Sequence, residues 1–195
     1  MTDRFTRDIF PTPIYVRDLE GEVLAQAQRE IADKMTQIMA QAQSLESVPN
    51  FSSTWNPRRN DDIQSFNLEG LMLSIINSGS DYFGDIGYEG RDLRLDKSWV
   101  NWAGYQSYMF DHDYPQARLV GTYYYQTSGT DGRRLFQTPV APAALGHWPY
   151  DWDIMPNYPL EPKVGRLVIW PAWLKNRVEV NLEQGEQITI NFTLI

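Results

Sequence analysis

Two histidines are the residues of this chain best suited to metal or acid–base chemistry. They are His112 and His147, and the chain contains no cysteine. His112 stands between Asp111 and Asp113, and imidazole and carboxylate are common ligands of transition metals. On an extended strand, however, successive side chains point to opposite faces, so His112 would face away from both carboxylates. The Asp-His-Asp run is therefore a poor set of metal ligands. The lack of cysteine excludes disulfides and iron–sulfur clusters.

Composition and charge narrow the class of protein. The 195 residues include 17 Lys+Arg and 25 Asp+Glu, a formal charge of −8. This acidic balance argues against binding to nucleic-acid phosphates, so we expect no nucleic-acid partner. Hydrophobic content of 42% is typical of a globular chain of one domain. No stretch approaches the roughly 18 apolar residues of a membrane span, and no apolar run follows Met1, so we expect no signal peptide.

Residues 1–98 are expected to form a strand followed by helices. Residues 14–16 follow two prolines and predict a short edge strand. Within 18–43, apolar residues recur at spacings of three and four, which predicts an amphipathic helix with one buried stripe. A second helix is expected over 67–83 with Asn67 as its N-cap. The polar, proline-containing stretch 44–62 is expected to be a loop.

Residues 99–195 are expected to form mainly β structure. Strands are predicted over 98–108, 118–126, 166–170 and 187–193, which are rich in Val, Ile, Tyr, Trp and Thr. The last of these alternates apolar and polar residues, as a half-buried strand does. Asp131-Gly132 predicts a hairpin turn between 123–126 and 135–136. Arg133 and Arg134 follow it and are expected to be solvated charges.

A segment rich in proline and aromatic residues, 136–162, interrupts the predicted strands. It contains six prolines, which argue against a regular strand ladder. It also carries four large aromatic residues that suit a surface for binding another protein chain: Trp148, Tyr150, Trp152 and Tyr158.

Short motifs in a fixed order carry a resemblance that spans most of the chain. They are Phe10-Pro11-Thr12-Pro13, Thr54-Trp55-Asn56-Pro57, Trp99-Val100-Asn101, and the runs 112–124, 165–178 and 187–192. In this order they resemble the signatures of iron(II)/2-oxoglutarate-dependent oxygenases related to the prolyl hydroxylases, a family common in marine phages and bacteria. The resemblance implies an α+β, mainly β fold. Its core would be a double-stranded β-helix, or jelly roll, over 99–195, with the N-terminal helices packed outside.

The same resemblance implies where the iron ligands and the co-substrate would lie, and here the chain departs from the family. Of the metal positions only His112 keeps a ligand, because Tyr114 occupies the second and Asn176 the distal histidine position. The arginine that would bind the carboxylate of 2-oxoglutarate is replaced at or near Gln187, and a neutral amide cannot form that bidentate pair. We therefore expect no catalytic residues, no bound metal and no cofactor.

Three functions are compatible with this sequence. The leading hypothesis is a catalytically degenerate oxygenase fold that serves as a structural or assembly module bound to other protein chains. Because phages carry this family, a virion neck, tail or baseplate protein is a natural candidate, which places the chain in a virion or the cytoplasm. The rival is an active Fe(II)/2-oxoglutarate-dependent dioxygenase. It would need His112, His147 and one of four aspartates to converge on a metal ion: Asp111, Asp113, Asp151 or Asp153. The third is a metal-free binder of small molecules at the barrel mouth.

Overall fold

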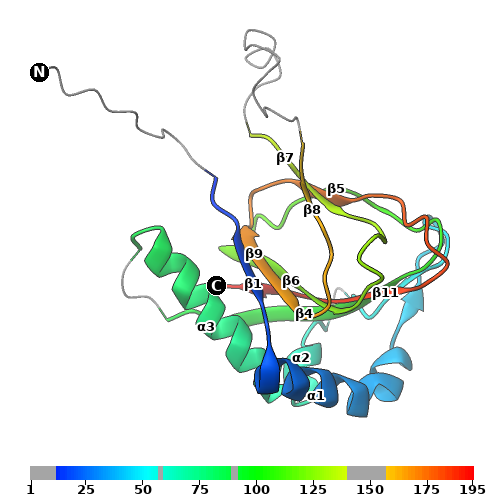
Figure 1. Cartoon of the computed structure of the whole chain (residues 1–195), viewed down its shortest axis with the longest axis horizontal. Helices are drawn as coiled ribbons and strands as arrows, with labels where there is room; N and C mark the ends of the chain where they lie inside the picture. The colour runs from blue at the N-terminus through cyan, green and yellow to red at the C-terminus, as the bar shows by residue number, and fades with distance from the viewer. Residues whose placement is uncertain (1–11, 57–58, 89–91, 140–156) are drawn as a thin grey trace, which may run out of the picture.

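The computed structural model describes residues 12–56, 59–88, 92–139 and 157–195 (Figure 1). Within these residues the strands form two antiparallel sheets, of seven and four strands. The larger has the order β1-β9-β6-β11-β4-β3-β2 and the smaller β5-β10-β7-β8. The larger sheet consists of β1 (Tyr15–Asp18), β2 (Gln43–Ser44), β3 (Phe51–Ser53), β4 (Leu95–Ala103), β6 (Leu119–Gln126), β9 (Arg166–Pro171) and β11 (Gln187–Leu194). The smaller sheet consists of β5 (Met109–His112), β7 (Arg134–Gln137), β8 (Asn157–Leu160) and β10 (Asn176–Val178).

From β4 to β11 the chain passes back and forth between the two sheets. β4, β6, β9 and β11 lie in the larger sheet, and β5, β7, β8 and β10 lie in the smaller one. Two facing sheets built in this way are a double-stranded β-helix, so the jelly roll implied by the resemblance is confirmed. β1, β2 and β3 extend the larger sheet at its two edges, so the sheet also uses residues N-terminal to 99.

The central strand β11 lies between the apolar core under the helices and the space between the two sheets. Every residue of this strand is buried. Ile188, Ile190 and Phe192 join the core that the helices cover. The residues between them, Thr189 and Asn191, line the space between the two sheets. The alternation predicted from the sequence is therefore present, but the polar side of the strand faces the barrel interior instead of solvent.

The helices pack on the outer face of the larger sheet, opposite the smaller sheet (Figure 1). α1 (Gly21–Met39) and α3 (Glu69–Asp85) match the two predicted helices. Asn67 is not the N-cap of α3, because the helix begins at Glu69 and its N-cap is Leu68. The Leu68 side chain forms no capping hydrogen bond. The carboxylate of Glu30 on α1 instead accepts hydrogen bonds from the backbone N–H groups of Gly70 (3.0 Å) and Leu71 (3.4 Å). None of the helices in the described residues is long and apolar enough to cross a membrane.

Three local predictions were wrong. The stretch 44–62 is not a simple loop, since β3 pairs with β2 and β4 and the short helix α2 (Asp62–Ser65) begins there. Asp131-Gly132 does not close a hairpin, because β6 and β7 belong to different sheets. The segment 136–162 does take part in a strand ladder, because β7 and β8 pair at its two ends. Pro159 is tolerated there because β8 is an edge strand.

Candidate functional site

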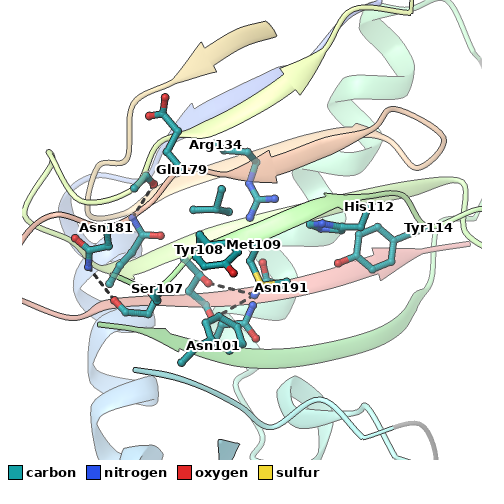
Figure 2. Close-up of a pocket in the computed structure, with 16 residues that line it drawn as sticks. Asn101, Ser107, Tyr108, Met109, His112, Tyr114, Arg134, Glu179, Asn181 and Asn191 are labelled. Atoms are coloured by element: carbon teal, nitrogen blue, oxygen red, sulfur yellow. Dashed lines mark hydrogen bonds between the residues drawn. The ribbon is translucent and has the colours of Figure 1, made fainter. Parts of the chain in front are cut away.

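A pocket opens between the two sheets inside the barrel (Figure 2). The space not filled by protein atoms is about 490 Å³, including the part that opens to solvent. The larger sheet contributes Asn101, Thr189 and Asn191, and the smaller sheet contributes His112 and Arg134. These five side chains form hydrogen bonds, and most of them are uncharged. Elsewhere between the sheets lies a second apolar cluster with members from both sheets.

His112 ends β5 and points into this pocket (Figure 2). Its Nδ1 lies 2.7 Å from the carbonyl oxygen of Phe110, so a neutral ring donates from Nδ1. Burial lowers the pKa of His112, and the positive charge of Arg134 adds to this effect. The hydrogen bond to the carbonyl oxygen of Phe110 opposes it, and the charges of Asp111 and Asp113 oppose it more weakly. At neutral pH the ring is therefore uncharged.

Asn176 is the register partner of His112 on the neighbouring strand β10. Its side chain is fully buried, and its Nδ2 donates to the carbonyl oxygen of His112 at 3.2 Å. Its Oδ1 accepts a hydrogen bond from Nη1 of Arg134. Both ends of the amide are thus occupied by protein groups at the position where the resemblance implies the distal histidine ligand.

Tyr114 also turns inward and packs among aromatic rings. Its ring centroid lies 5.4 Å from that of His112 and 5.5 Å from that of Trp99. Burial raises the pKa of the Tyr114 phenol to about 12, so the hydroxyl stays protonated. A protonated phenol on an aromatic cluster is a weak substitute for the carboxylate or imidazole implied at this position.

The described residues do not fit an iron site. They include no group of three His, Cys, Asp or Glu side chains that could hold a metal ion. Asp111 and Asp113 are exposed while His112 and Tyr114 are partly buried. His147, Asp151 and Asp153 lie outside the described residues, as do the proposed interface residues Trp148, Tyr150 and Trp152.

Gln187 holds a turn in place at the start of β11. Its Nε2 donates to the carbonyl oxygen of Asp131 at 2.6 Å and to that of Gly132 at 3.3 Å. It also lies 3.1 Å from Oδ1 of Asp131. The position implied for the co-substrate's arginine therefore fixes the connection between β6 and β7.

Arg134 lies between the two sheets, so the expectation that it is a solvated charge was wrong. It is only 5% exposed. Nη2 donates to Oγ1 of Thr122 at 3.1 Å, and Cζ lies 4.9 Å from the ring centroid of Trp170. The alternation of side chains in β7 could have predicted this position. Arg134 is two residues from the apolar Phe136, so both side chains lie on the inward face of the strand.

Comparison with known proteins bears on this barrel directly. Residues 97–193 match the model of a family described as "Putative 2OG-Fe(II) oxygenase". The C-terminal half of the chain belongs to this family. Searching curated protein sequences finds no match.

Solved structures of the 2OG-Fe(II) oxygenase class share the fold over most of the chain. A prolyl-4-hydroxylase from Pseudomonas putida is 10% identical with a TM-score of 0.63, covering 94% of this chain and 92% of that one. SnoN, a non-heme α-ketoglutarate-dependent epimerase from nogalamycin biosynthesis, is 10% identical with a TM-score of 0.67, covering 94% and 76%. A prolyl hydroxylase from Trichoplax adhaerens, in complex with a hypoxia inducible factor peptide, is 11% identical with a TM-score of 0.61, covering 93% and 83%. At such identities the likeness shows the fold alone.

Proposed function

We propose that this oxygenase-fold chain does not perform iron-dependent oxygenation and acts as a structural or assembly module. The main observation against iron-dependent oxygenation is the buried amide of Asn176. An amide is a weak iron ligand beside imidazole. Turning it toward a metal would also break its hydrogen bonds to Arg134 and to the main chain of His112, leaving buried polar groups without partners.

An exposed groove beside β8 supports the assembly role. Tyr158 lies on this edge strand and is 61% exposed. The groove spans about 830 Å³ including open solvent and is bordered by Ile14, Val16, Phe136 and Leu174. Exposed aromatic residues beside an apolar groove are typical of protein-binding surfaces, and an edge strand offers unpaired backbone groups. The proposed partners are other protein chains, and the most specific form of the proposal is a phage neck, tail or baseplate component.

Iron content tests the loss of oxygenation. The purified chain is incubated with Fe(II) without oxygen, desalted and assayed for bound iron and for succinate formed from 2-oxoglutarate in air. We expect neither stoichiometric iron nor succinate. The double variant Tyr114→Asp/Asn176→His, checked for folding by circular dichroism, restores the implied ligand types and is expected to bind more iron than the natural chain. Stoichiometric iron with turnover in the natural chain would overturn the proposal.

Two aromatic residues at opposite edges of the smaller sheet allow a matched test of assembly. Tyr158 lies on β8 and Phe110 lies on β5, where it is 63% exposed. We expect Tyr158→Ala to reduce assembly, measured by light scattering and by proteomics of purified particles, while Phe110→Ala leaves it unchanged. The same loss is expected of Trp148→Ala and Trp152→Ala. A chain that stays monomeric and absent from particles contradicts the assembly role.

A further inference from the structure

We propose that a groove where α3 ends binds an extended, proline-rich segment of another protein chain. The groove spans about 1230 Å³ including open solvent and is bordered by the end of α3, the turn after β9 and Pro13. Among the described residues, it shares no lining residue with the pocket between the sheets or with the groove beside β8. The inference therefore goes beyond the assembly role and does not depend on it.

The end of α3 builds one wall of this groove. The backbone N–H of Tyr88 donates to the carbonyl oxygen of Phe83 at 2.8 Å, and that of Gly87 donates to the carbonyl oxygen of Gly84 at 3.0 Å. With Gly87 at a φ of 73°, these two bonds form a Schellman motif, which often carries a hydrophobic contact across the helix end. Here the rings of Tyr88 and Phe83 pack together, with centroids 5.0 Å apart. Tyr88 and Ile86 are thereby fixed at the groove while both remain exposed.

A tight turn after β9 builds another wall. The backbone N–H of Leu174 donates to the carbonyl oxygen of Pro171 at 2.9 Å, and the side chains of Ala172 and Leu174 are buried. Trp173 lies between them, borders the groove and is 56% exposed. Trp is one of the residues enriched at the energetic centres of protein interfaces. Because the turn is already formed, Trp173 loses little conformational freedom when a partner binds.

The chain's own Pro13 shows what kind of group this groove accommodates. Pro13 borders the groove, and its carbonyl oxygen accepts a hydrogen bond from the Tyr82 hydroxyl at 3.1 Å. Burial raises the pKa of Tyr82 to about 12, so the hydroxyl stays protonated and remains a donor. Proline in an aromatic-lined groove is the contact by which polyproline segments are recognised. The groove thus already holds one proline and continues past it toward exposed aromatic rings.

The polar groups of the groove favour a ligand that is uncharged and rich in hydrogen-bond acceptors. Arg118 and Asp85 border the groove, so its charges balance. Arg118 forms no salt bridge within the part of the chain that the structure describes, and its guanidinium and the Trp173 indole both offer N–H donors. A proline-rich segment presents carbonyl oxygens with few N–H groups and no charge. It is already extended before binding, so little ordering entropy is lost.

The probe for this groove is a fluorescein-labelled proline decamer, blocked at its free end. A glycine–serine decamer with the same label is the control, because it is equally uncharged but has no preformed extended conformation. We expect fluorescence anisotropy to show saturable binding of the proline peptide to the natural chain and no saturable binding of the control. Equal behaviour of the two peptides would overturn the proposal.

Two variants and two controls locate the binding. Trp173→Ala removes the exposed ring, and we expect the Kd for the proline peptide to rise by at least about tenfold. Ile86→Ser removes an exposed apolar contact and should also raise the Kd, so it tests the groove even if Trp173→Ala fails to fold. Trp55→Ala is the matched control, because Trp55 is also exposed but borders a different groove. Tyr158→Ala is the second control and should likewise bind the peptide as the natural chain does.

The controls separate this groove from other binding places. Weaker peptide binding in Trp55→Ala or Tyr158→Ala, with unchanged binding in folded Trp173→Ala, would place the peptide elsewhere and contradict the proposal. Self-association that Trp173→Ala abolishes and the proline peptide does not inhibit, measured by light scattering, would show that a second copy occupies the groove instead. Since Tyr158→Ala addresses only the assembly role, the two proposals fail in different experiments.

Discussion

The buried amide of Asn176 accepts a hydrogen bond from the guanidinium of Arg134 across the neighbouring strands β10 and β7. The same amide donates to the main chain of His112 on β5. One side chain therefore ties three strands of the smaller sheet together at the position where the resemblance implies an iron ligand. The connection is made by hydrogen bonds between protein groups alone.

Asn176→Ala tests the structural value of this connection. The change removes an acceptor from Arg134 and a donor from the carbonyl oxygen of His112. Since buried polar groups left without partners cost about 1–3 kcal/mol, we expect the free energy of unfolding to fall by about that amount in urea denaturation. Gln137→Ala, at the exposed end of β7, is the control and should change stability by less than about 0.5 kcal/mol. Equal stability of the two variants would show that the amide connection is not needed.

Gly121→Ala tests the close contact between β6 and β11. A Cβ at position 121 would overlap Cζ of Phe192 and lie 2.6 Å from the carbonyl oxygen of Val168. We expect a loss of about 1–3 kcal/mol in the free energy of unfolding, because the buried ring and the backbone must both shift. Gly185→Ala is the matched control, since a Cβ there meets no atom within 4 Å. A Gly121→Ala variant as stable as the control would show that the core relaxes without strain.

The ion pair between β1 and β9 predicts a dependence of stability on acid. The hydrogen bond from Arg166, with a further one from Lys163, holds the pKa of Asp18 at about 2, against an ordinary value of 3.8. Because the pKa is lower in the folded chain, this stabilisation is present above about pH 4 and is lost as the pH falls through about 2. Asp18→Asn should therefore lower stability at pH 7 by about 1 kcal/mol after solvent screening.

Denaturation at several pH values checks this prediction. The difference between Asp18→Asn and the natural chain should shrink between about pH 4 and pH 2. Glu22→Gln on α1 is the control, because its pair with Arg29 is largely exposed and should add nothing measurable. A difference that stays constant down to pH 2 would contradict a lowered pKa for Asp18.

The sequence predicts the helices and the central strands because their periodicity is strong. The 3–4 spacing in α1 and the alternation of Ile188, Ile190 and Phe192 both reflect burial against one core. Alternation does not say what covers the polar side of a strand. That side of β11 is buried by the smaller sheet, which only the tertiary structure shows.

The sequence predicts the candidate site only in part. The order of short motifs along the chain identified His112, Tyr114 and Asn176 as the candidate site. The structure places all three close to one another. Arg134 was missed because a pair of arginines after a turn is usually solvated. Its partners Thr122, Asn176 and Trp170 are 12 or more residues away along the chain, and such distant contacts leave no local pattern.

The most direct test of the central claim is anomalous diffraction at the iron edge from crystals soaked anaerobically in Fe(II). We predict no iron peak within about 2.0–2.3 Å of the His112 ring nitrogens, the usual range for metal ligands, and an Asn176 amide still bonded to Arg134. An iron peak at that distance from His112, with two further protein ligands around it, would contradict the account.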